Sequence, residues 1–316
     1  ERSIAKWVKA WRTTPAFCHS PSTGGSPDPS ARADQPSSGS ARIPPSIPLI
    51  LYGIAANVSV GDMFIAGILP GILVTLTLLV FAYFFARANG LGGGEKSSLG
   101  DVFRAGKKAI LAILMPVIIL GGIYGGVFTP TEAAVIAVAY SFVIGTLIYR
   151  EIKFASLVGI LKQSAVTTAV VLSIIGAAGL YGRILQSLRV PDMISDFVIS
   201  AIDSPLLFIL LANLLLLLAG MFIEAAAAIL IFVPILLPIA VSYGFDPIHF
   251  GIIMVVNLAM GMFTPPVGLN LFVASQITNI GIARLTWAVM PFVAIVLANL
   301  LIISLLPVLS TWLPSL

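Results

Sequence analysis

Most of this chain consists of apolar runs long enough to cross a lipid bilayer. Five uninterrupted runs reach the roughly 20 residues that a membrane-spanning helix needs: 63–87, 108–128, 131–149, 163–182 and 285–312. Charged residues make up only 9% of the 316 residues and hydrophobic residues make up 59%, whereas a soluble domain carries about 25% charged residues. This composition excludes a soluble globular enzyme and predicts an all-α polytopic membrane protein.

The start of the chain, 1–42, differs from the rest. Residues 19–40 are rich in Ser, Pro, Gly and Asp without an apolar period, which predicts disorder. The tract 1–42 carries six basic and three acidic residues, so most of the net charge of +4 resides there and not on the membrane part. No basic stripe indicates a nucleic-acid partner. One cysteine and two histidines argue against a disulfide or a zinc cluster.

The positions of the basic loops predict the orientation in the membrane. Residues 87–108 contain five Lys or Arg side chains and residues 150–162 contain three, and loops with such an excess remain in the cytoplasm. Residues 183–204 carry mixed charges and are expected on the far side as an amphipathic segment.

The apolar stretch 249–278 is interrupted by a proline pair. Pro265 and Pro266 stand between Gly261 and Gly268, and proline cannot donate the hydrogen bond that would continue a helix. A broken helix inside a membrane exposes carbonyl oxygens that suit Na⁺ and a half-helix N-terminus that suits an anion. A simple packing kink is the alternative interpretation.

A second proline pair lies near the start of the apolar part, at Pro44 and Pro45, where PPSIPLILYG aligns with PPVGLNLFVA. Matching proline-interrupted segments in two halves of a membrane chain are typical of transporters built from inverted repeats.

The stretch 205–242 is expected to be a re-entrant hairpin with half-length limbs, 205–219 and 227–242, that meet in a tip at 220–226. Glu224 in this tip either binds a cation or proton or holds the tip by accepting hydrogen bonds from backbone N–H groups. The sequence Thr129-Pro130-Thr131-Glu132 predicts a helix-capping box, and His249 is expected to anchor a helix at the membrane interface.

Four segments resemble one family, the DctM-like large membrane subunits of TRAP (tripartite ATP-independent periplasmic) transporters. They are IPPSIPLILYG (43–53), GGIYGGVFTPTEAA (121–134), GMFIEAAAAILIFVPILLPIA (220–240) and MGMFTPPVGLNLFVAS (260–275). The resemblance implies an elevator-type transporter of the ion transporter superfamily kind in the bacterial inner membrane. It implies Na⁺-coupled import of organic acids such as C4-dicarboxylates or sialic acid, with a DctQ-like small membrane subunit and a DctP-like periplasmic binding protein as partners. No cofactor is expected beyond Na⁺ as the coupling ion.

The resemblance also implies that the first repeat is truncated. We expect 1–42 to be a disordered or non-native tract, 43–107 the remnant of the first repeat, and 108–316 the second repeat. The second repeat is expected to contain scaffold helices (108–182), an amphipathic segment (183–204), a hairpin (205–242), a broken helix (249–278) and a last membrane helix (285–312).

The candidate sites combine the two proline breaks with the hairpin tip. Candidate ion-binding residues are Ser46, Gly220, Glu224, Thr264, Gly268 and Asn270. Candidate substrate-binding residues are Pro44, Pro45, Ser46, Thr264, Pro265 and Pro266. Two alternatives to the TRAP subunit are a single-component Na⁺/dicarboxylate symporter and a non-functional truncated fragment. An intramembrane enzyme is not expected, because no nucleophile with a base and no metal cluster is visible.

Overall fold

The computed structural model describes residues 46–88, 98–150, 152, 154–278 and 280–315. Within these ranges the chain is helical and contains no β-strand. The helices are α2 (Ile47–Ala56), α3 (Val60–Ala66), α4 (Ile68–Ala88), α5 (Leu99–Tyr124), α6 (Pro130–Val143), α7 (Phe154–Ser187), α8 (Val190–Ala201), α9 (Pro205–Phe222), α10 (Ala225–Ser242), α11 (Pro247–Gly261), α12 (Leu269–Thr278), α13 (Ile282–Leu305) and α14 (Val308–Thr311). One turn of π-helix, Ile144–Ile148, extends α6.

Six helical segments in the described ranges are long and apolar enough to cross a membrane. They are Val60–Ala88, Pro130–Ile148, Leu157–Ser187, Pro205–Phe222, Ala225–Ser242 and Ile282–Leu305. Many of their large apolar side chains are exposed, such as Val138 on α6 and Leu172 on α7. Hydrocarbon chains solvate such side chains without penalty, whereas water does not. The predicted all-α polytopic membrane fold is therefore confirmed.

The contacts divide the chain into two compact units. One contains residues Glu1–Ser38 and Leu79–Lys96, of which the structure describes the last part of α4. In that part, the Arg87 guanidinium donates to the Tyr83 hydroxyl at 3.2 Å, one helical turn away. The other unit contains Gly39–Leu78 and Ser97–Leu316, and the candidate site lies entirely within it.

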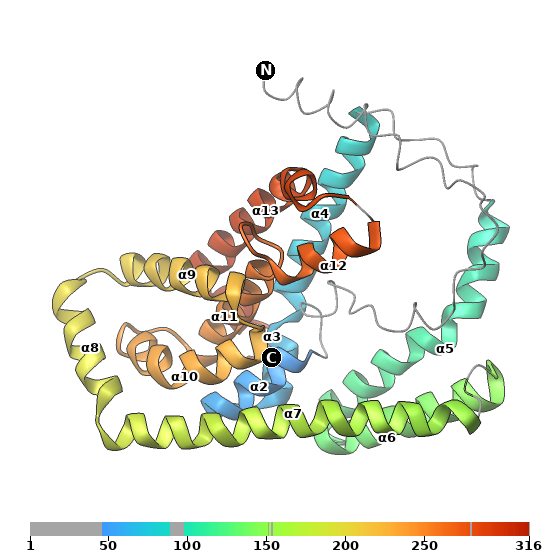
Figure 1. Ribbon diagram of the computed structural model, residues 1–316, viewed down its shortest axis with the longest axis horizontal. Coiled ribbons are helices and arrows are strands. Elements are labelled where there is room, and N and C mark those ends of the chain that lie inside the picture. Colours follow the sequence, from blue (N-terminus) through green and yellow to red (C-terminus); the bar gives the residue numbers. More distant parts are fainter. Residues whose placement is uncertain (1–45, 89–97, 151, 153, 279, 316) are drawn as a thin grey trace. The chain divides into compact units, whose positions relative to one another are not determined.

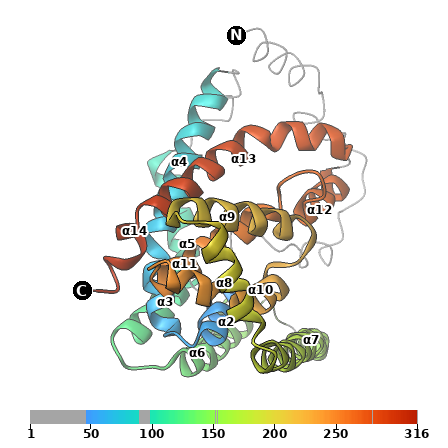
Figure 2. The same ribbon diagram turned by 90° about the vertical axis from the view of Figure 1, so that its left-hand side faces the viewer.

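Helix α11 forms the centre of this second unit. Every residue from His249 to Gly261 is buried, because α2, α9, α10 and α13 all pack on this helix. Figures 1 and 2 both show α2, α9 and α10 gathered around it. Because lipid gives little hydrophobic drive to helix association, this bundle depends on close packing and on hydrogen bonds between helices.

The helices around the two proline pairs repeat along the chain. Helices α2 and α12 each have 10 residues and each follow a proline pair. The next helix begins at Val60 after α2 and at Ile282 after α12. The separation in sequence from Ile47 to Leu269 equals that from Val60 to Ile282, which supports the predicted internal repeat.

The N-terminal end of α6 matches the sequence prediction. The Glu132 backbone N–H donates to the Thr129 hydroxyl at 3.3 Å, and the Thr129 backbone N–H donates to the Glu132 carboxylate at 2.8 Å. The predicted capping box is therefore confirmed, and Glu132 has a structural role at this helix end.

The hairpin has the predicted bounds but not the predicted limbs. Helices α9 and α10 have 18 residues each, and only Ile223 and Glu224 connect them. The expected half-length limbs and the tip at 220–226 are wrong, since each limb is about 27 Å long at 1.5 Å per residue. The re-entrant course through the membrane stays a prediction.

Other boundaries also differ from those expected. Helix α7 has 34 residues and extends to Ser187, so the amphipathic segment is the shorter helix α8. The last helix is interrupted at Leu306 and Pro307 before α14. The apolar part of α5, Ile110–Tyr124, is shorter than the expected run 108–128. The tract 1–42 and the candidates Pro44 and Pro45 lie outside the described residues.

Candidate functional site

The helix α11 ends where the proline pair predicts. Residues 262–268 are not helical, because neither Pro265 nor Pro266 can donate a backbone hydrogen bond. Several non-helical hydrogen bonds hold the turn, among them the bond from Thr264 N–H to the Gly261 carbonyl at 3.0 Å and the bond from Asn270 N–H to the Met262 carbonyl at 2.9 Å. The interruption between α11 and α12 is therefore confirmed.

Gly268 makes the tight return into α12 possible. Its φ of +49° lies in the left-handed region, which costs a residue with a Cβ roughly 1–2 kcal/mol. A Cβ here would also lie 3.0 Å from the Thr264 carbonyl oxygen. Glycine at this position thus serves the backbone of the break.

Thr264 is buried inside the break. Its hydroxyl donates to the Met260 carbonyl at 2.7 Å, and this bond uses the only hydrogen that the hydroxyl can donate. The lone pairs of the oxygen remain available, which is the arrangement that a bound cation requires of a hydroxyl.

Ser46 is the second buried hydroxyl of the candidate site. It is the N-cap residue of α2 and is 4% exposed. Its hydroxyl has no hydrogen-bond partner among the described residues. Leaving a buried polar group unpaired costs about 1–3 kcal/mol, so this hydroxyl is an unexplained polar group at a helix N-terminus.

The first limb of the hairpin runs beside α11 and ends at the same level. Near their middles, the Asn257 side-chain amide of α11 donates to the Asn213 carbonyl of α9 at 2.8 Å. Towards their C-terminal ends, a Cβ on Gly261 would lie 2.6 Å from the carbonyl carbon of Gly220. The two helices are therefore parallel, and their C-terminal ends are in backbone contact.

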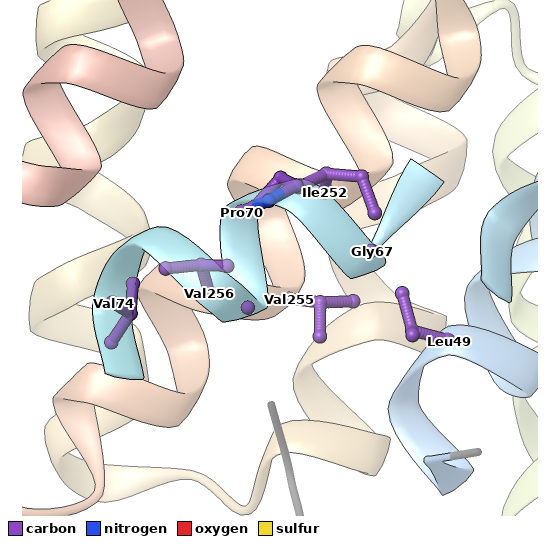
Figure 3. A pocket seen from close by; sticks show the side chains of 8 residues that line it. Leu49, Gly67, Pro70, Val74, Ile252, Val255 and Val256 are labelled. Atoms are coloured by element: carbon purple, nitrogen blue, oxygen red, sulfur yellow. The ribbon is translucent and has the colours of Figure 1, made fainter. Parts of the chain in front are cut away.

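Helix α2 runs in the opposite direction along α11. The Tyr52 hydroxyl donates to the Pro247 carbonyl, at the start of α11, at 2.6 Å. Leu49, one turn earlier in α2, lines a crevice with Ile252 and Val255, further along α11 (Figure 3). Ser46 is one more turn in the same direction, which places it towards the end of α11 where the helix breaks.

The crevice between α2, α4 and α11 is not itself a ligand site. The residues that line it, among them Leu49 and Val256, are apolar, and its volume is about 10 Å³ (Figure 3). A cavity of that size holds at most about one water molecule.

The ends of the helices give this region its electrostatic character. The C-terminal ends of α9 and α11 each carry a partial negative charge. Several of their last carbonyl oxygens, such as that of Gly261, accept one hydrogen bond from the turn that follows and keep a second lone pair. The N-terminal ends of α10 and α12 follow shortly after them in the chain, and these ends carry partial positive charge. The arrangement can hold a cation at the carbonyl ends and an anion at the N–H ends.

The predicted site residues differ in how far they are buried. Gly220, Thr264, Gly268 and Ser46 are buried, Asn270 and Pro265 are half-buried, and Glu224 and Pro266 are exposed. The direction of α2 along α11 places Ser46 towards the end of α11 that leads into the break. Glu224 is the N-cap of α10 without a side-chain cap bond, so the expected role of holding the tip in that way is wrong.

Sequence reasoning missed the buried polar groups next to the break. Asn213, Asn257 and Ser304 are buried and hydrogen-bonded to one another. Polar residues inside apolar runs were the available signal. His249 is 1% exposed and bonded to Ser310 at 2.6 Å, and its position at the membrane interface stays a prediction.

The fold and the site define a multi-span membrane protein with a discontinuous helix and converging helix ends, which is the architecture of secondary transporters. The chain matches the family described as the DctM component of the tripartite ATP-independent periplasmic transporters over residues 31–309. The chain belongs to this family. The resemblance to TRAP large membrane subunits and the bacterial inner-membrane location are thereby confirmed.

Several relatives are similar over most of the chain. The sialic acid TRAP transporter large permease protein SiaM of Vibrio cholerae is 39% identical over 274 residues, which cover 87% of this chain and 64% of that protein. The C4-dicarboxylate TRAP transporter large permease protein DctM of Pseudomonas aeruginosa is 42% identical, over 86% of this chain and 64% of the relative.

A third relative is the isethionate TRAP transporter permease protein DctMQ of Oleidesulfovibrio alaskensis. It is 43% identical over 84% of this chain and 42% of its own length. The chain thus spans less than two thirds of the length of these curated relatives. All three are named as transporter permeases, not as enzymes.

Proposed function

We propose that this chain acts as the large membrane subunit of a TRAP transporter that imports an organic acid together with Na⁺. The observation that carries the proposal is the meeting of the α9 and α11 C-terminal ends beside the break, in a chain of the DctM family. Carbonyl and hydroxyl oxygens are the ligands that suit a hard cation. Among the described residues, no group of three His, Cys, Asp or Glu side chains offers another metal site.

We assign the Na⁺ ligands to the carbonyl oxygens around the break and to nearby polar side chains. The hydroxyls of Ser46 and Thr264 and the amide of Asn270 supply side-chain oxygens. Gly220 and Gly268 let the backbones approach closely enough for their carbonyls to contribute. The exposed Glu224 remains a candidate only as a residue that attracts the cation to the tip.

The substrate class follows from the helix N-termini. The N-terminal end of α12 would attract a carboxylate or sulfonate, and the relatives are named for sialic acid, C4-dicarboxylates and isethionate. We place the acid between the two proline breaks, at Ser46, Thr264, Pro265 and Pro266, together with Pro44 and Pro45.

The proposed transport cycle needs two partner proteins and a movement of the bundle. A DctP-like periplasmic binding protein would deliver the acid, and a DctQ-like small membrane subunit would support the complex. An elevator movement of the bundle around α11 would carry both ligands across the membrane.

Uptake into proteoliposomes tests this function. The chain, purified with a small membrane subunit, should take up a radiolabelled dicarboxylate or sialic acid only with an inward Na⁺ gradient and added binding protein. The Ser46→Ala and Thr264→Ala variants should each need about three- to tenfold more Na⁺ for half-maximal uptake, because each loses one oxygen ligand. Uptake without binding protein would indicate the single-component symporter, and no uptake under any condition would indicate a non-functional fragment.

A further inference from the structure

A chain of hydrogen bonds links three helices just before the break. The Asn257 side-chain amide of α11 donates to both the carbonyl and the side-chain oxygen of Asn213 on α9, each at 2.8 Å. The Asn213 amide donates to the Ser304 hydroxyl of α13 at 2.9 Å. Ser304 donates in turn to the Leu300 carbonyl at 2.8 Å. Asn257 is 0% exposed and Asn213 is 6% exposed.

The direction of every bond in this chain is determined. Ser304 has one hydrogen, which goes to the Leu300 carbonyl, so its oxygen must accept from the Asn213 amide. The Asn213 side-chain oxygen therefore faces Asn257 and accepts from its amide. Turning the Asn257 amide over would bring its oxygen against two acceptors, so that orientation is excluded. The Asn257 oxygen is left without a partner among the described residues.

These bonds set how far α11 is shifted along α9. Asn257 bonds to the backbone of α9, so a shift by one residue, about 1.5 Å, would break the contact. The Gly220 and Gly261 backbones meet about one turn later on α11 and two turns later on α9. The same shift would bring a side chain of Ala219 or Met221 into this contact. Inside a membrane, polar bonds and small residues are the main means of specifying such a register.

We propose that Asn257 is a positioning residue for the cation site: it holds the C-terminal ends of α9 and α11 in the register that brings their carbonyl oxygens together. It acts through Asn213 and does not itself touch the cation. This inference rests on the function proposed above.

The test compares Asn257→Ala with Asn299→Ala. Asn299 is a matched control, because it is 2% exposed and its amide donates to Thr77 at 2.7 Å and to Ile295 at 3.0 Å, away from α9 and α11. Asn257→Ala should raise the Na⁺ concentration for half-maximal uptake about three- to tenfold, as expected for losing one or two buried hydrogen bonds. The KM for the acid at saturating Na⁺ should stay close to that of the original protein. Asn299→Ala should leave the Na⁺ requirement unchanged.

A purely structural role would lower the melting temperature of both variants alike without a selective effect on Na⁺, and that result would overturn the inference. If Asn257→Ala fails to fold, Asn213→Ala provides the test, because it removes the side-chain acceptor of the Asn257 amide and keeps the backbone carbonyl acceptor. It should raise the Na⁺ requirement about two- to threefold, and an unchanged requirement would count against the inference. If the original protein shows no Na⁺ dependence, the proposed function itself is wrong.

Discussion

Single residues decide whether the helices around the break can meet at all. A Cβ on Gly261 would lie 2.6 Å from the carbonyl carbon and 2.7 Å from the Cα of Gly220. Backbone atoms in two packed helices cannot move aside as the end of a flexible side chain can. Gly220 and Gly261 therefore permit the convergence of carbonyl ends on which the candidate site depends.

Replacing Gly261 with alanine should force α9 and α11 apart. We expect Gly261→Ala to destabilise the protein by about 1–3 kcal/mol, the usual cost of overpacking, and to weaken Na⁺-dependent uptake. Gly176→Ala on α7 is the control, because a Cβ there meets nothing within 4 Å. Unfolding in detergent measures the stability of both, and equal stability of the two variants would contradict the close approach.

At the scale of elements, the important feature is the gap between α11 and α12. Because two consecutive residues lack a backbone N–H, the Gly261 and Met262 carbonyls accept hydrogen bonds from Thr264 and Asn270 inside the break and not from a continuing helix. Gly268 with φ of +49° turns the chain back into a helix. In the sequence, α2 also follows a proline pair, and its N-cap hydroxyl on Ser46 is buried and has no hydrogen-bond partner in the part of the chain that the structure describes.

Closing the gap should abolish the cation site and leave the fold intact. In Pro265→Ala/Pro266→Ala, restored N–H groups should let the helix continue, since proline costs a helix interior about 3 kcal/mol. We expect greater helicity by circular dichroism, no loss of thermal stability and no Na⁺-dependent uptake. Pro116→Ala is the control, because Pro116 lies inside the continuous helix α5. Retained Na⁺ dependence in the double variant would rule out the break as the cation site.

At the scale of the whole molecule, the placement of charge along the chain orients the membrane spans. Basic residues gather in 87–108 and 150–162, whereas Asp203 and Asp246 flank the hairpin α9–α10. The hairpin begins and ends on the same side of the membrane. This holds if both limbs cross the bilayer fully and also if they turn back inside it.

Cysteine labelling tests this orientation. In a Cys18→Ser background, which removes the single native thiol, a membrane-impermeant maleimide should label Asp203→Cys in intact cells. It should label Ser98→Cys only after permeabilisation, because the positive-inside rule keeps that loop in the cytoplasm. Both residues are exposed, so access depends on the side of the membrane. The reverse pattern would invert the predicted topology.

Much of this architecture could be predicted because membranes restrict the choice of structure. A chain in lipid must pair its backbone groups internally, so apolar runs become helices. Prolines then mark where a helix ends, and Thr129 with Glu132 marks where one begins. The lengths of α9 and α10 could not be predicted in this way, since an apolar run does not reveal that so short a turn suffices between them.

The sequence by itself determined the membrane class, the family, the helix breaks and the repeat spacing, because these depend on local residue chemistry and on the period of apolar residues. Only the tertiary structure decided which helix ends meet. The contact of Gly220 with Gly261, the Asn257–Asn213 bonds and the burial of His249 against Ser310 join residues that lie far apart in the sequence. Such contacts follow from the relative directions of packed helices, which no local pattern specifies.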